Sequence, residues 1–170
     1  MMPTIAMATS RQSAARSLHP DTLGWLTEND PWPVVGWSDP GDRRPGALSS
    51  QRVREVFWLP MIGPSCTLAA RLLAAWLDAE PAGFKVSVSC LASSLGLGSG
   101  LGRNAPVNRT LGRLVDFGIA RIDGKAFAVR RSFPPLAARQ ITRITDHLAE
   151  LHASQLEAAG THPSRARANR

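Results

Sequence analysis

Apolar residues recur every three or four positions in several parts of the chain, and this spacing predicts amphipathic helices. The first predicted helix lies in PSCTLAARLLAAWLDAEPAG, with Ser65 or Thr67 as its cap and an end near Glu80 and Pro81. Its apolar face is expected to contain four leucines and a tryptophan: Leu68, Leu72, Leu73, Trp76 and Leu77.

Two further helices are predicted on either side of a glycine-rich insert at 96–102. Ser89 is expected to cap the shorter one, CLASSLG. Asn104 is expected to cap the longer one, residues 104–117, and Pro106 suits its first turn because that amide needs no helical partner. The longer helix carries an apolar stripe: Val107, Leu111, Leu114 and Val115.

Strands are predicted where apolar and polar residues alternate or where short apolar runs end at a turn. Residues 84–89, FKVSVS, alternate in this way. The run 56–59 predicts another short strand, stopped by Pro60. The dipeptide Asp123-Gly124 separates two short β-like runs and is a strong signal for a two-residue hairpin turn.

Residues 1–50 are predicted to form an irregular arm, because proline, glycine and aspartate are dense there. The arm nevertheless contains three tryptophans, Trp25, Trp32 and Trp37. Two interpretations are open: the rings pack back onto the folded domain, or they are aromatic anchors for a partner protein.

The C-terminal part is predicted to be one helix over 134–158, followed by a basic, disordered tail at 159–170. The helix carries a narrow apolar seam: Ile141, Ile144, Leu148 and Leu151. Such a seam can pack on its own domain or on a symmetry mate, and we expect a homodimer.

The length of 170 residues suits one domain with tails, and the formal net charge of +7 implies an acidic partner: nucleic acid, an anionic membrane surface or an acidic protein. The charge is concentrated. The segment 103–143 holds nine arginines and lysines against Asp116 and Asp123. The whole basic excess can therefore lie on one structural unit.

Several classes of function are not supported by the residues. The chain has two cysteines and four scattered histidines, none at zinc spacing, so we expect no metal and no cofactor. Cys66 and Cys90 are expected to be buried thiols in a reducing, cytoplasmic compartment, with a redox pair as the alternative. No apolar run approaches the ~20 residues of a membrane helix. No catalytic trio or carboxylate pair is visible, so we do not expect an enzyme.

Three stretches carry a resemblance to a known family: SCLASSLGL, NAPVNRTLGRLVDFGIARI and RIDGKAFAVRR. Residues 65–133 resemble a winged helix-turn-helix domain of the MarR-like and related bacterial transcriptional regulators. The resemblance implies a mainly α fold with a small β-hairpin (α+β), a domain over 51–133, a recognition helix at 104–117 and a wing at 119–131. The glycine-rich insert departs from the usual short turn; it is either a loop that leaves the helix pair intact or a contact for phosphate.

The predicted function is therefore a transcriptional regulator that binds double-stranded DNA. Arg109 and Arg113 are expected to face away from the apolar stripe, with Asn108 at the edge of that face; there Arg can read guanine and Asn adenine. The full set of predicted DNA contacts is Arg103, Asn104, Asn108, Arg109, Arg113, Arg121, Lys125, Arg130 and Arg131. The alternative to DNA contact is that Arg109 and Arg113 only face the solvent and pair with Asp116.

Two other functions fit the same pattern. The domain can be a protein-interaction module that docks on a larger complex, with the tryptophan arm as the contact. It can also be a DNA-binding protein of plasmid or phage replication or partition.

Overall fold

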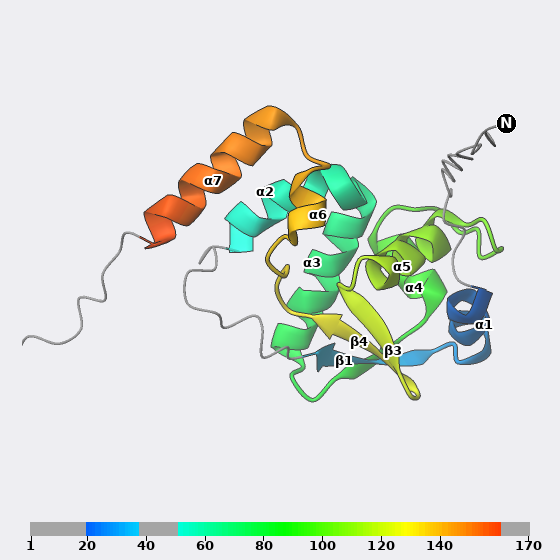
Figure 1. Ribbon diagram of the computed structural model, residues 1–170. Helices are drawn as coiled ribbons and strands as arrows, with labels where there is room; N and C mark the ends of the chain where they lie inside the picture. The colour runs from blue at the N-terminus through cyan, green and yellow to red at the C-terminus, as the bar shows by residue number, and fades with distance from the viewer. Residues whose placement is uncertain (1–19, 38–50, 161–170) are drawn as a thin grey trace, which may run out of the picture.

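A computed structural model describes residues 20–37 and 51–160 of the chain. The fold combines helices with a four-stranded sheet, and α3 and α5 pack against that sheet (Figure 1). The strands are β1 (Trp32–Trp37), β2 (Phe84–Val86), β3 (Ala120–Asp123) and β4 (Ala126–Arg130). The helices are α1 (Pro20–Glu28), α2 (Gln51–Ile62), α3 (Pro64–Ala79), α4 (Val88–Ser94), α5 (Pro106–Asp116), α6 (Ala138–Ile141) and α7 (Asp146–Gly160). The predicted mixture of helices with a small β element is confirmed.

The sheet has the strand order β2-β1-β4-β3, so β1 is an inner strand. It pairs antiparallel with β2, through Trp32 opposite Val86, and parallel with β4, through Val34 opposite Phe127. The predicted irregular arm is therefore wrong for residues 20–37, which form α1 and β1. The rest of that arm, and the tail from 161 onward, lie outside the described residues.

The tryptophans of β1 and α1 pack on the domain, as one of the two interpretations expected. Trp32 is fully buried, and its ring centroid lies 5.1 Å from that of Phe127. Trp25 stacks on the same phenylalanine at 6.5 Å, and its Nε1 donates to the Gly124 carbonyl at the hairpin tip. Trp32 is thus unavailable as an anchor for a partner protein.

The region predicted as a strand at 56–59 is instead part of α2. Phe57, Trp58 and Ile62 are buried and share one side of a helix, which outweighs the effect of Pro60 near the helix end. Trp58 Nε1 donates to the Pro134 carbonyl at 2.8 Å and fixes the chain that leads to α6. The strand prediction failed because the run was too short to separate period two from period 3.6.

The helices α3, α4 and α5 are confirmed, but each of them begins at a different residue from the predicted cap. α3 has Gly63 as its N-cap, and the Thr67 hydroxyl donates to the Gly63 carbonyl instead of capping the helix. Ser65 makes no cap either. Leu68, predicted on the apolar face, is 52% exposed, because α3 turns smaller residues inward: Cys66, Ala69 and Ala70.

The next two helix starts are shifted in the same way. Ser87, not Ser89, caps α4 by accepting from the Cys90 amide at 3.1 Å. α5 has Ala105 as its N-cap, so Asn104 is not the cap; Pro106 lies in its first turn as expected. The hairpin is confirmed, with the loop after Asp123, because that residue pairs with Ala126.

The predicted single C-terminal helix is two helices, α6 and α7, with a break between them. The apolar seam is divided by that break. Ile144 is buried against Phe57 of α2, with Ile141 and Leu148 packed beside it, whereas Leu151 is 37% exposed. Part of the seam therefore packs on its own chain. No described helix is long and apolar enough to cross a membrane.

The buried imidazole of His152, on α7, is expected to make the stability of the protein depend on pH. The side chain of His152 is buried, with the ring edge-on to Phe57 at 5.0 Å, and burial lowers the pKa of the imidazole. The folded protein disfavours the charged imidazole, so neutral His152 favours folding at a pH above the usual histidine pKa of about 6.5. This contribution to stability is lost as the pH falls below about 6.5 towards the lower pKa of the folded protein.

We therefore expect the free energy of unfolding in urea to fall between pH 7.5 and 5.5. The substitution His152→Phe should flatten that part of the curve. Equal pH dependence in the two proteins would show that His152 does not couple α7 to pH.

Candidate nucleic-acid interface

The helix predicted to enter DNA, α5, is covered on most sides. Helices α1, α3 and α4 and strand β3 all contact it. Six of its residues are buried: Val107, Asn108, Thr110, Leu111, Gly112 and Leu114. The exposed residues are Pro106, Arg109 and Arg113, at positions i, i+3 and i+7. The solvent-exposed face of α5 is therefore narrow and not a broad recognition surface. We call its three exposed residues the α5 strip.

Asn108 does not reach the solvent, so its predicted role in reading bases is wrong. The side chain is 3% exposed, and Nδ2 donates to the carbonyls of Leu101 and Gly102 at 3.2 and 3.0 Å. Asn108 holds the end of the glycine-rich insert against α5. Gly112 is buried as well, so it offers no close approach to a groove.

The two arginines of the α5 strip have different surroundings. Arg113 donates to the Met61 carbonyl at 2.7 Å, and its guanidinium carbon lies 5.5 Å from the centre of the Phe117 ring. Arg109 is exposed and makes no side-chain hydrogen bond or ion pair with any described residue. The alternative that both arginines pair with Asp116 is not what the described contacts show.

The base of the hairpin is held by structural contacts. Arg130 is 8% exposed; its Nε donates to the Gly118 carbonyl at 2.9 Å, and its guanidinium lies 3.9 Å from the Trp37 ring centre. Arg131 donates to the Leu77 carbonyl at 3.1 Å. These two arginines were predicted to contact DNA. The structure instead places Arg130 in the protein interior, and it ties Arg131 to α3.

The outer part of the hairpin is more accessible. Arg121 pairs with Asp123 at 2.7 Å and lies over the Trp37 ring at 4.7 Å. Lys125, in the loop, is exposed. Arg103 and Asn104 are exposed in the loop before α5. The exposed members of the predicted site are therefore Arg103, Asn104, Arg109, Arg113, Arg121, Lys125 and Arg131, of which Arg131 is tied to α3.

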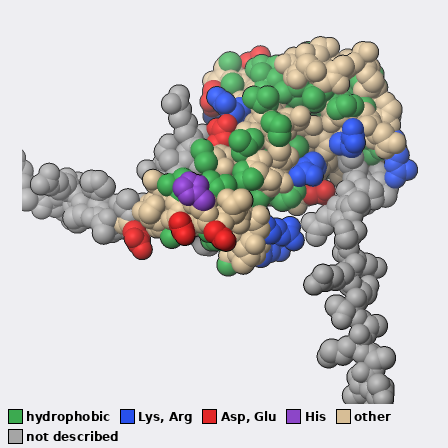
Figure 2. Space-filling model, turned by 90° about the horizontal axis from the view of Figure 1, so that it is seen from above, with side chains coloured by type: hydrophobic (Ala, Val, Ile, Leu, Met, Phe, Trp, Pro, Cys, Tyr) green, Lys and Arg blue, Asp and Glu red, His purple; other side chains and the backbone are tan. Residues whose placement is uncertain are grey.

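Two basic residues outside the predicted site adjoin the α5 strip. Arg139 on α6 and Arg143 just after it line a cavity together with Phe117, the ring beside Arg113. We call Arg109, Arg113, Arg139 and Arg143 the arginine row. Figure 2 shows Lys and Arg side chains spaced across one part of the molecular surface. Both missed residues lie in the basic segment 103–143, so the charge distribution was the signal that could have identified them.

The remaining candidate chemistry is sparse. Cys66 is buried and Cys90 exposed, so the expected burial of both thiols is wrong for Cys90; both are unbridged. Burial raises the pKa of the Cys66 thiol, which disfavours a reactive thiolate. Among the described residues no group of three or more His, Cys, Asp or Glu side chains could hold a metal ion.

No family model, curated protein or solved structure matches the chain. The interpretation of the interface therefore rests on its own residues.

Proposed function

We propose that the protein binds duplex DNA and acts as a winged-helix regulator, with phosphate contacts from the arginine row as the main source of affinity. The observation that carries this proposal is the composition of the α5 strip. Its polar positions, Arg109 and Arg113, are exposed cations, and the row continues past the end of α5 to Arg139 and Arg143. An array of this kind fits a polyanion.

The order of the elements supports the winged-helix part of the proposal. From α3 the chain runs helix, strand, helix, helix and hairpin, through β2, α4, α5, β3 and β4. This is the order implied by the resemblance to MarR-like regulators. The inner strand β1, which lies before the predicted domain at 51–133, is a departure, since strands were predicted only at 56–59, at 84–89 and in the hairpin.

The packing of α5 favours phosphate contacts over base reading. A helix that reads bases needs several polar side chains that can reach base edges in the major groove. In α5 the predicted reader Asn108 is engaged with the backbone of the insert. Phosphate contacts position a protein on DNA but carry no direct sequence information. We therefore expect strong salt dependence with modest sequence preference.

The test is binding to a pool of random 30-base-pair duplexes, measured by fluorescence anisotropy over a salt series and followed by sequencing of the retained DNA. Four phosphate contacts correspond to a log–log slope of about −3.6, since each contributes about 0.9. An enriched palindrome would additionally support a homodimer that reads two half-sites. Absence of binding at low salt would reject the proposal.

A second candidate function is docking on a protein. Three exposed apolar residues on neighbouring helices favour it: Val56 and Leu59 on α2, and Leu68 on α3, at 48, 43 and 52% exposure. A partly exposed ion pair between Glu55 and Arg71, with 3.4 Å between the charged atoms, spans those two helices. This candidate replaces the DNA proposal if the duplex pool is not bound. It predicts that Leu59→Asp with Leu68→Asp abolishes assembly with the partner and leaves the fold intact.

A further inference from the structure

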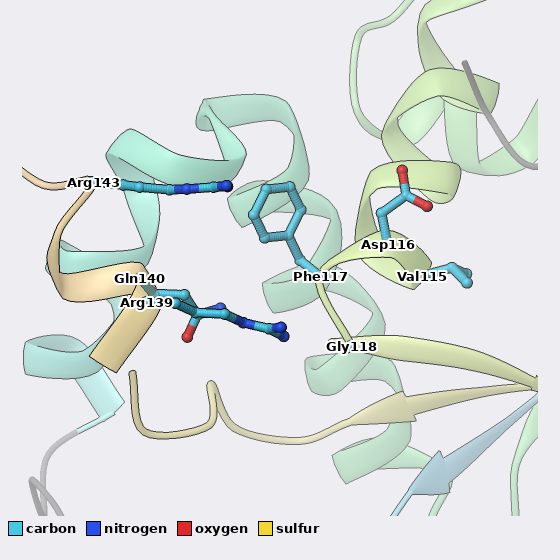
Figure 3. A pocket seen from close by; sticks show the side chains of 7 residues that line it. All are labelled: Val115, Asp116, Phe117, Gly118, Arg139, Gln140 and Arg143. Carbon is cyan, nitrogen blue, oxygen red and sulfur yellow. The ribbon is translucent and has the colours of Figure 1, made fainter. Parts of the chain in front are cut away.

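A cavity of about 310 Å³ lies where α5 ends and α6 packs against it. Figure 3 shows the guanidinium groups of Arg139 and Arg143 directed across the cavity towards the α5 end, on either side of the Phe117 ring. Asp116 also lines the cavity, but its carboxylate points away from both arginines in that view. The two positive charges are thus directed into a cavity whose one lining carboxylate, that of Asp116, makes no ion pair with either arginine.

The polar groups around the cavity are mainly hydrogen-bond donors. Arg139 and Arg143 make no side-chain hydrogen bond or ion pair with any described residue. Gln140 uses its Oε1 to accept from the Ala137 amide at 2.7 Å, which leaves its NH₂ group as a donor. Guanidinium forks bind phosphate or carboxylate oxygens in pairs. The donor set therefore fits an anion.

The size of the cavity and the Phe117 ring in its lining indicate more than a bare ion. A volume of 310 Å³ corresponds to about ten water molecules at about 30 Å³ each. It falls at the lower end of the range for ligand pockets, roughly 300–1,000 Å³. The Phe117 ring forms part of the wall, and Trp58 supports it edge-on, with 6.3 Å between ring centroids. A phosphate group held by the two arginines does not by itself cover the part of the Phe117 ring that lines the cavity.

We propose that the cavity binds an organic phosphate. Arg139 and Arg143 hold the phosphate oxygens, and the sugar or ring attached to the phosphate packs against Phe117. The phosphate can come from a free nucleotide or from the backbone of a bound duplex. The second source rests on the proposed DNA-binding function, and the first does not.

The test uses the full chain and titration calorimetry with three probes: adenosine 5′-monophosphate, inorganic phosphate and adenosine. We expect the monophosphate to bind most tightly, inorganic phosphate more weakly and adenosine not at all. The double substitution Arg139→Ala with Arg143→Ala should weaken monophosphate binding by about tenfold or more. The conservative pair Arg139→Lys with Arg143→Lys should recover part of it, because lysine keeps the charge but loses the bidentate fork.

Two further measurements distinguish the sources of the phosphate. If the duplex backbone occupies the cavity, the double alanine variant lowers the salt slope for DNA by about 1.8, at about 0.9 for each contact, and DNA competes with the monophosphate. If a free nucleotide is the ligand, DNA affinity changes little, the monophosphate binds independently, and the phosphate contacts of the arginine row reduce to Arg109 and Arg113. The control is Arg71→Ala, which removes an exposed arginine of α3 that pairs with Glu55 of α2, and it should change neither result.

Two results overturn the proposal. One is monophosphate binding that survives loss of both arginines, which places the ligand elsewhere. The other is absence of monophosphate binding together with an unchanged salt slope for DNA in a variant whose circular dichroism matches the wild type. Neither result depends on Arg109, so failure of this site is distinguishable from failure of the DNA-binding proposal.

Discussion

Replacing Trp32 by alanine is expected to lower the free energy of unfolding by about 3–5 kcal/mol, the usual cost of deleting a large buried aromatic side chain. Trp32 is fully buried in an inner strand and contacts the Phe127 ring of the neighbouring strand. A domain of this size has a stability of about 5–15 kcal/mol. The substitution therefore removes a large share of it. Urea unfolding followed by far-ultraviolet circular dichroism measures the change.

Trp32→Phe provides the matched control. Trp32 Nε1 is buried and has no hydrogen-bond partner among the described residues, and an unpaired buried donor costs about 1–3 kcal/mol. Phenylalanine removes that donor but leaves part of the space empty, so the two effects oppose each other. We expect a change within about 1.5 kcal/mol. A small effect of Trp32→Ala would contradict the inner position of β1. It would instead favour the original prediction that residues 20–37 belong to an irregular arm.

The parts of the fold that could be predicted are those with local signals. α3 and α5 have apolar stripes within one helix, and the dipeptide Asp123-Gly124 marks the hairpin, although the loop itself is Gly124-Lys125. β1 has no comparable local signal. Its pairing partners β2 and β4 are distant in the chain, and Pro31 and Pro33 point to a turn rather than a strand. Only the long-range pairing with both β2 and β4 makes this segment an inner strand.

The candidate site could be predicted as a charged region but not residue by residue. Helical spacing placed Arg109 and Arg113 on the solvent side of α5, and the structure agrees. The same spacing placed Asn108 at the edge of that face, yet the insert folds back and accepts two hydrogen bonds from it. Arg130 and Arg131 are held by backbone carbonyls of Gly118 and Leu77. Backbone acceptors carry no sequence signal, so these arginines appeared free.

The second large effect is expected from replacing both arginines of the α5 strip by glutamine. Glutamine removes the charge and the long guanidinium reach by which Arg113 donates to the Met61 carbonyl, but it keeps a polar amide. Each lost phosphate contact at an exposed position is worth about 1 kcal/mol. Two contacts lower duplex affinity about 30-fold, since 1.4 kcal/mol is a factor of ten. The salt slope should become less steep by about 1.8.

The control for this double variant is Arg71→Gln on α3, whose side chain is 60% exposed and pairs with Glu55. It removes an exposed positive charge outside the arginine row, so it separates a local contact from a general loss of net charge. If the control weakens binding as much as the double variant, the affinity comes from net charge and not from α5. If the double variant loses affinity equally for all duplexes, Arg109 and Arg113 contact phosphates. A loss confined to an enriched sequence would instead show that these arginines read bases, despite the narrow exposed strip of α5.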